Sequence, residues 1–173
     1  MTDGPPLPRE VIIRFAQPTD VDTILTFIRE LAEYEKMSDQ VVATDQELQG
    51  TLFGERPAAE ALICEWSGDP VGFAVFFHNY STFRGRPGLY LEDLYVRPVW
   101  RGRGLGRALL QRLALIAVER GCPRMEWSVL DWNQPAIDFY QSLGALPLND
   151  WTVFRLTGES LRRAAQAARV DHE

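Results

Sequence analysis

Residues 89–107 read Leu89-Tyr-Leu-Glu-Asp-Leu-Tyr-Val96-Arg-Pro-Val-Trp-Arg101-Gly-Arg-Gly104-Leu-Gly106-Arg107. The first half predicts a buried strand, and glycines at 102, 104 and 106 predict a turn that enters a long amphipathic helix. Such a turn leaves backbone N–H groups free to point at one anion, and the helix N-terminus adds partial positive charge. Arg101, Arg103 and Arg107 add full charges. We therefore predict a phosphate or pyrophosphate site at the C-terminal end of this strand.

Hydrophobic periodicity and capping signals predict the elements on either side. Thr19-Asp-Val-Asp22 and Thr44-Asp-Gln-Glu47 each read as a capping box at a helix start, and Asn133 reads as the cap of a later helix. Upstream we expect a strand at 10–17, helices at 19–37 and 44–54, and a hairpin of strands 61–66 and 71–80. Downstream we expect a helix ending at 121, a strand at 124–130, a helix at 133–144, a closing strand at 151–156 and a helix at 159–169. Strands 89–96 and 124–130 are joined by a helix, so they are parallel if adjacent, whereas the hairpin is antiparallel. The prediction is an α/β (α+β) fold with a mixed sheet.

Length and composition describe one soluble globular domain. The chain has 173 residues, 46% of them hydrophobic, and a net charge of −6, which argues against a nucleic-acid binder. We expect a flexible N-terminus at 1–9, a single domain at 10–157 and a C-terminal helix or tail at 158–173. Residues 1–8 show no signal-peptide core, no apolar run approaches about 20 residues, and Cys64 and Cys122 lack metal-ligand spacing. These features predict a cytoplasmic protein with no membrane partner.

The charge is divided along the chain. Residues 17–55 carry nine acidic and two basic side chains, a net charge of −7, whereas residues 84–124 carry nine arginines and three acids, a net charge of +6. Solvated helix faces explain part of this division. It also fits a protein that meets a cation with one region and an anion with the other.

The glycine-rich turn alone fits a dinucleotide fold, a nucleotide phosphate loop or an acyl-CoA site. No Gly-Lys-[Ser/Thr] follows it, which excludes the Walker phosphate loop. A Rossmann fingerprint opens a repeating βαβ series, whereas this unit lies in mid-chain after an antiparallel hairpin.

Three motifs together resemble a known family. They are Leu91-Glu-Asp-Leu-Tyr-Val-Arg-Pro98, Arg101-x-x-Gly-x-Gly106, and Asp131-Trp-Asn-Gln-Pro-Ala-Ile-Asp-Phe-Tyr140-Gln-Ser-Leu-Gly-Ala145. They closely resemble the GNAT superfamily of N-acetyltransferases, and within it the spermidine/spermine and thialysine (diamine) acetyltransferases. The resemblance covers Val11–Leu156. It implies the GNAT fold with about six to seven strands and splayed central parallel strands, acetyl-CoA as cosubstrate, no metal, and a homodimer.

The resemblance also implies which residues contact acetyl-CoA. The glycine-rich turn is expected to bind the pyrophosphate through backbone amides, and the strand before it to lie beside the pantetheine arm. The expected contacts are Leu94, Tyr95, Val96, Arg101, Gly102, Arg103, Gly104, Leu105, Gly106, Arg107, Asn133 and Tyr140. The family's strand carries a bulge here. The adjacent acids Glu92 and Asp93 independently predict an irregularity, since a regular strand sends neighbours to opposite faces.

For catalysis, Tyr140 matches the general acid that protonates the departing thiolate. A phenol with a pKa near 10 holds its proton at neutral pH and releases it to a sulfur anion. Glu92 and Asp93 are expected to bind and deprotonate the amine, with Tyr34 and Glu35 matching further substrate positions. Without the motif, Tyr140 reads as a packed aromatic and the acids as surface charges.

The predicted substrate is a small primary amine. Where the polyamine branch carries an acid and a tryptophan after the hairpin, this chain has Ser81 and Phe83, so thialysine or a short diamine fits better than a long polyamine. Two alternatives remain. One is acetylation of a protein N-terminus or lysine, and the other is a non-catalytic acyl-CoA-binding regulatory module.

Overall fold

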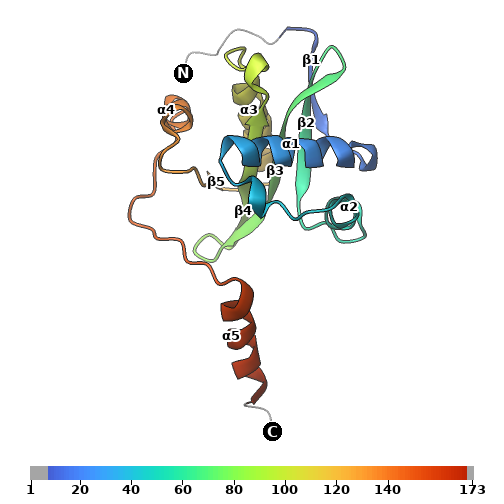
Figure 1. Ribbon diagram of the computed structural model, residues 1–173. Coiled ribbons are helices and arrows are strands. Elements are labelled where there is room, and N and C mark those ends of the chain that lie inside the picture. The colour runs from blue at the N-terminus through green and yellow to red at the C-terminus, as the bar shows by residue number, and fades with distance from the viewer. Residues whose placement is uncertain (1–7, 171–173) are drawn as a thin grey trace. The chain divides into compact units, whose positions relative to one another are not determined.

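The computed structural model describes residues 8–170, which form two compact units divided between Ser128 and Val129 (Figure 1). Each unit is described by itself. Seven of the nine residues predicted as a flexible N-terminus, and the last three of the predicted tail, lie outside the described residues.

The first unit is a five-stranded mixed sheet with helices on both faces. In chain order its elements are β1 (Val11–Phe15), α1 (Val21–Tyr34), α2 (Asp45–Phe53), β2 (Glu60–Trp66), β3 (Asp69–Ser81), β4 (Arg86–Val96), α3 (Leu105–Glu119) and β5 (Met125–Trp127), with short 3-10 turns at Pro18–Asp20, Ser38–Gln40 and Pro98–Trp100. The strand order is β1-β2-β3-β4-β5. Strands β1 to β4 pair antiparallel, which confirms the predicted hairpin of β2 and β3, and β4 pairs parallel with β5, as predicted. Within the described residues the sheet has five strands rather than the six to seven expected.

Helices α1 and α3 cover opposite faces of this sheet (Figure 1). Phe27 of α1 stacks on Phe73 of β3, with ring centroids 5.3 Å apart. Arg120, directly after α3, lies over Phe76. Because Phe73 and Phe76 are three residues apart in one strand, their side chains point to opposite faces. The apolar residues whose helical spacing predicted α1 and α3 therefore form the faces of these helices that pack on the sheet.

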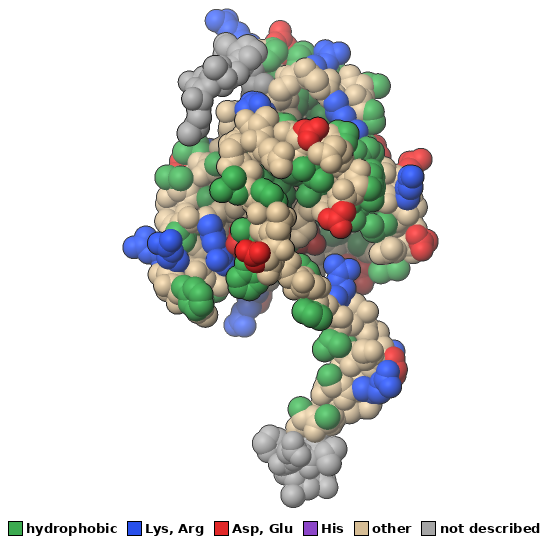
Figure 2. Space-filling view, turned by 90° about the vertical axis from the view of Figure 1, so that its left-hand side faces the viewer, with side chains coloured by type: hydrophobic (Ala, Val, Ile, Leu, Met, Phe, Trp, Pro, Cys, Tyr) green, Lys and Arg blue, Asp and Glu red, His purple; other side chains and the backbone are tan. Residues whose placement is uncertain are grey.

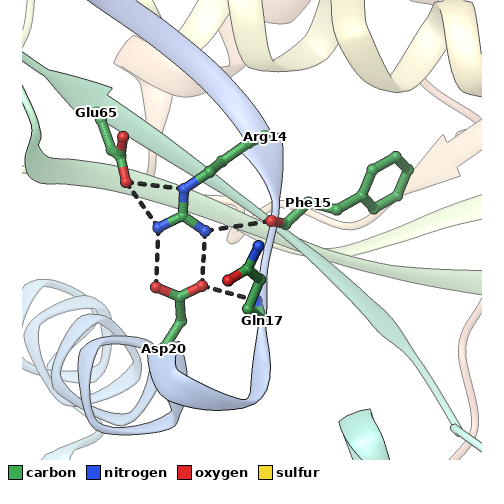
Figure 3. Close-up of polar contacts among 5 residues, drawn as sticks. All are labelled: Arg14, Phe15, Gln17, Asp20 and Glu65. Carbon is green, nitrogen blue, oxygen red and sulfur yellow. Dashed lines mark hydrogen bonds and ion pairs between the residues drawn. The ribbon is translucent and has the colours of Figure 1, made fainter.

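The start of α1 is held by an ion-pair cluster between three elements (Figure 3). Arg14 of β1 donates to both carboxylate oxygens of Asp20, at 2.7 and 2.9 Å, and its Nε donates to Glu65 of β2 at 2.8 Å. The backbone N–H of Gln17 also donates to Asp20. The capping box predicted at residues 19–22 was therefore wrong in register. It is formed by Gln17 and Asp20, one 3-10 turn before α1.

The second capping box is confirmed. The Thr44 hydroxyl accepts from the backbone N–H of Glu47, and the Glu47 carboxylate accepts from the backbone N–H of Thr44 at 2.9 Å. This reciprocal pair satisfies donors that the first turn of α2 would leave open.

The second unit contains α4 (Gln134–Ser142) and α5 (Gly158–Val170). The strand predicted at 151–156 is wrong, since the segment has no regular structure and pairs with no strand within the described residues. Its Trp151, Val153 and Phe154 are 77%, 82% and 91% exposed. Figure 2 shows hydrophobic side chains spaced along the chain that leads into α5. Strand propensity alone forms no strand without a neighbour that accepts its backbone hydrogen bonds.

Candidate active site

Strand β4 contains a bulge at the predicted position. Asp93 pairs with Val75 and Leu91 pairs with Phe76, so Glu92 is the extra residue between them. Asp93 therefore shares the sheet face of Val75, which packs against the α1 side of the core, while Glu92 is exposed. The bulge lets two adjacent acids escape strict alternation.

Three carboxylates lie together around this bulge. The pKa of Asp93 is raised from an ordinary 3.8 to about 6, mainly by burial and in addition by the negative charges of Glu92 and Glu35. Burial also raises the pKa of Glu35, which directly follows α1. A group of carboxylates that repel one another attracts an ammonium ion and includes one member able to hold a proton near neutrality. The structure thus brings Glu35, Glu92 and Asp93 together, and their role in binding an amine stays a prediction.

Beyond the bulge, β4 separates from β5. The two strands pair only over Leu89–Leu91 and Met125–Trp127. The strand predicted at 124–130 therefore ends at Trp127, because the residues after it have no partner. Of the predicted cofactor contacts in this half of β4, Tyr95 turns its side chain into the core, 6.1 Å from Phe27. Only its backbone is left to meet a ligand.

The glycine-rich turn that follows has the geometry of an anion cradle. Gly102 and Gly104 have φ angles of +75° and +83°, which L side chains rarely adopt. Gly104 is the N-cap of α3 and has no side chain that could accept from the backbone N–H groups of the first turn. Leu105, Gly106 and Arg107 form that first turn. These residues fit a pyrophosphate group.

The arginines of the turn are engaged with aromatic rings. The Arg101 guanidinium lies 4.7 Å from the Tyr34 ring centroid and 5.6 Å from that of Tyr95, and its Nε donates to the Val96 carbonyl at 2.8 Å. From the sequence, Arg101 was predicted to contact only the cofactor. In the structure it also connects the glycine-rich turn to the end of α1.

Arg103 has a similar environment. Its guanidinium lies 5.4 Å from the Trp66 ring centroid and 5.0 Å from that of Trp100. The two indoles contact each other at 5.1 Å. No local pattern in the sequence predicts these contacts, because β2 and this turn are far apart in the chain.

Asn133 and Tyr140 belong to the second unit. The Asn133 side chain is buried and accepts from the backbone N–H of Ala136 at 3.4 Å, so it caps α4 as predicted. Tyr140 lies on α4 with its ring 5.4 Å from that of Phe139. Their predicted contacts with acetyl-CoA, and the role of Tyr140 as an acid, stay predictions.

No group of three or more His, Cys, Asp or Glu side chains in residues 8–170 is placed to hold a metal ion. Within the same part of the chain, no helix is long and apolar enough to cross a membrane.

Comparisons with known proteins agree with the motifs. The Acetyltransferase (GNAT) family profile matches residues 25–145. The thialysine N-epsilon-acetyltransferase of Bos taurus is 42% identical over 166 residues, covering 90% of this chain and 97% of the relative. An L-ornithine N5-acetyltransferase of Arabidopsis thaliana is 33% identical, covering 87% of this chain and 86% of the relative.

Solved structures show the same architecture. An integron cassette protein from the mobile metagenome of V. cholerae superposes with a TM-score of 0.78 at 25% identity, covering 92% of this chain and 99% of the other. An aminoglycoside acetyltransferase from an uncultured soil metagenomic sample superposes with a TM-score of 0.74 at 18% identity, covering 87% and 97%. Family profile, relatives and architecture agree, and the chain belongs to the GNAT family of acetyltransferases.

Proposed function

We propose that the protein transfers an acetyl group from acetyl-CoA to the primary amine of a small substrate, thialysine or a diamine or polyamine-like compound, by direct attack in a ternary complex. The observation that carries this proposal is the group of Glu35, Glu92 and Asp93 at the point where β4 leaves β5. The relatives named for thialysine and L-ornithine both act on amino acids with a side-chain amine, which supports the same substrate class.

Acetyl-CoA fits the features found at the end of β4. The turn from Arg101 to Arg107 would hold its pyrophosphate through backbone N–H groups, with the left-handed Gly102 and Gly104 shaping the cradle. The backbone of Leu94–Val96 would bind the pantetheine arm, and Asn133 would contact it. The thioester supplies the acetyl group.

In the proposed mechanism, Glu92 or Asp93 binds the ammonium form of the substrate and takes one proton, so that nitrogen has a free electron pair. Asp93 suits this role because its pKa of about 6 lets it release the proton to solvent at neutral pH. The nitrogen then forms a bond to the acetyl carbon as the carbon–sulfur bond breaks. Tyr140 is proposed to donate its phenolic proton to the leaving sulfur. The second proton of the attacking nitrogen passes through solvent to the Tyr140 phenolate, so the products are a neutral amide and a thiol.

A small substrate is favoured by the β3–β4 turn. Ser81 is buried and Phe83 is fully exposed, so this turn offers no carboxylate at the two positions that distinguish the polyamine branch. A second or third distant ammonium of a long polyamine would lack a counter-charge there.

We also propose a cytoplasmic homodimer. Leu146, Leu148 and Phe154 are 84%, 61% and 91% exposed, which is unusual for apolar residues so close in sequence. A second copy of the chain is the proposed cover. Cys64 and Cys122 are buried free thiols, in keeping with a reducing compartment.

The test is thiol release from acetyl-CoA with thialysine, lysine, putrescine, spermidine and N-terminal peptides. We expect turnover with the small amines and little with peptides. Inactivity on all five would overturn the proposal in favour of a binding module, and turnover of peptides alone would indicate a protein acetyltransferase. Undiminished kcat of Tyr140→Phe across pH would exclude Tyr140 as the acid.

A further inference from the structure

A second polar group lies on the sheet next to the carboxylates. We name it the head-group cluster and define it as Asn79, Tyr90, Arg124, Glu126 and Ser128. Asn79 Nδ2 donates to Glu126 Oε2 at 2.9 Å, and Arg124 Nε lies 3.0 Å from the same oxygen. The hydroxyls of Tyr90 and Ser128 are 2.8 Å apart. The proposed mechanism uses none of these five residues.

The head-group cluster shares a sheet face with Asp93. In β3, Val75 and Phe77 are two residues apart and point the same way. Val75 pairs with Asp93, and beyond the bulge Phe77 pairs with Tyr90. Tyr90 in turn pairs with Glu126 of β5. Asp93, Tyr90 and Glu126 therefore lie on one face. Without the bulge, Asp93 and Tyr90 would point to opposite faces, because they are three residues apart in the chain.

Asn79 is oriented to hold Glu126. With its Nδ2 turned to the carboxylate, its Oδ1 is buried without a hydrogen-bond partner among the described residues. Leaving such an acceptor unpaired costs on the order of 1–3 kcal/mol, and such an exception in a native protein calls for a reason. The arrangement also needs Gly88, since a Cβ there would lie 2.4 Å from Oδ1. We take the fixed position of the Glu126 carboxylate to be the reason.

The head-group cluster offers complementary charges side by side. Both contacts of Glu126, with Asn79 and Arg124, use Oε2, and within the described residues Oε1 has no partner, so it can accept from an ammonium. Arg124 uses only Nε, which leaves its terminal N–H groups for a carboxylate, and the neighbouring Tyr90–Ser128 hydroxyl pair can donate to the same group. An ammonium and a carboxylate on one carbon are the head group of an α-amino acid.

The spacing suits a substrate of lysine length. Asp93 and Tyr90 pair with Val75 and Phe77, which are two residues apart in β3. Asp93 and Tyr90 are therefore about 7 Å apart along the strand direction. The distal nitrogen and Cα of an extended lysine are about 6 Å apart, given single-bond lengths near 1.5 Å. The rings of Phe77 and Tyr90, with centroids 5.1 Å apart, lie at the far level and offer apolar contact to the methylenes or a thioether.

We propose that the head-group cluster binds the α-ammonium and α-carboxylate of an amino-acid substrate whose distal amine is acetylated. Glu126 binds the ammonium, Arg124 with Tyr90 and Ser128 binds the carboxylate, and Asn79 positions Glu126. This inference rests on the proposed function, because it assumes that the distal amine lies at Asp93.

Three matched substrates separate the contributions of the α-ammonium and the α-carboxylate to binding. Lysine has both head-group charges, cadaverine keeps only the ammonium, and pentylamine has neither. We expect Arg124→Gln to lower kcat/KM for lysine about tenfold or more and to leave cadaverine and pentylamine unchanged. We expect Glu126→Gln to lower kcat/KM for lysine and cadaverine by a similar factor and to leave pentylamine unchanged. Tyr90→Phe, which removes only a hydroxyl, should affect lysine alone.

The controls are Arg29→Gln and Glu10→Gln, the same chemical changes at exposed positions outside the site. Equal losses for lysine and pentylamine in Arg124→Gln would mean a structural role and would overturn the inference, as would unchanged lysine kinetics. Calorimetric binding of lysine in the presence of CoA distinguishes the two proposals. Lysine that binds in an Arg124-dependent way without being acetylated would support the head-group site and count against the proposed function. No lysine binding by the wild-type protein would overturn the head-group site.

Discussion

Arg101 lies against Tyr34, with its guanidinium carbon 4.7 Å from the ring centroid, and so joins the glycine-rich turn to the last residue of α1. Glu35, one of the three site carboxylates, is the next residue in the chain. A substitution in the turn can therefore alter the positions of Tyr34 and Glu35, at the proposed amine site, through one cation–π contact.

Replacing Arg101 by lysine tests this connection. Lysine keeps the charge but loses the planar stacking on Tyr34 and the Nε hydrogen bond to Val96. We expect the KM for the amine, measured at saturating acetyl-CoA, to rise severalfold. A rise in the Kd for CoA with an unchanged amine KM would show that Arg101 serves the cofactor alone.

Asp93→Asn should stabilise the protein while lowering its activity. The pKa of Asp93 is raised to about 6 from 3.8, so the folded state takes up protons that the unfolded state releases. The ionised group thus destabilises the fold above pH 6, and this cost disappears as the pH falls towards 4. At pH 8 the variant should be more stable by on the order of 2–3 kcal/mol.

Urea unfolding at pH 8 and at pH 4 measures that difference, with Asp39→Asn as an exposed control. An equal gain at both pH values would contradict a titrating Asp93. The acidic limb of kcat/KM near pH 6 should shift or vanish in Asp93→Asn if this carboxylate is the base.

Asp20→Asn should have the opposite effect on stability. The hydrogen bonds from Arg14 are the main cause that lowers the pKa of Asp20, so its contribution is complete above the unfolded pKa of about 4 and is lost as the pH falls through the lower folded value. We expect a loss of about 1–3 kcal/mol at pH 7, because a buried carboxylate loses its charge and Arg14 is left less well paired. Asp22→Asn, at an exposed position in the first turn of α1, is the control. If the two variants still differ by the full amount at pH 2.5, electrostatics is not the source.

Gly104→Ala and Gly50→Ala form a matched pair. Both added Cβ atoms would meet nothing within 4 Å, but only Gly104 has a positive φ. We expect Gly104→Ala to cost about 1 kcal/mol and to weaken CoA binding, since the strain rotates the amides of the cradle. Gly50, inside α2, should gain up to about 1 kcal/mol in urea unfolding. Unchanged CoA affinity in Gly104→Ala would argue against the cradle.

Local signals in the sequence predicted most of the first unit. The Thr44–Glu47 box, the leucine stripe of α3 and the parallel pairing of β4 with β5 depend on residues near one another or on one crossover. The bulge was also predictable, because two adjacent acids in an apolar strand conflict with alternation.

Other features depend on tertiary structure and could not be predicted from the sequence. Arg103 contacts Trp66 of β2, and Asn79 of β3 donates a hydrogen bond to Glu126 of β5. The residues of each pair are too far apart in the sequence for a local pattern to predict the contact. The segment 151–156 shows the reverse case. Its apolar pattern predicted a strand from propensity, and this prediction was wrong because no partner strand among the described residues pairs with it.

The extra residue at Glu92 also limits how the site can change during evolution. Substitutions at Asp93 or Tyr90 would alter one contact at a time. Deletion of Glu92 would restore regular alternation with Asp93 and Tyr90 still on one face, but it would remove one carboxylate of the group together with the bulge. A lineage can therefore change its substrate by point substitution, whereas the loss of one residue from β4 would change the charge of the site and the shape of the strand at the same time.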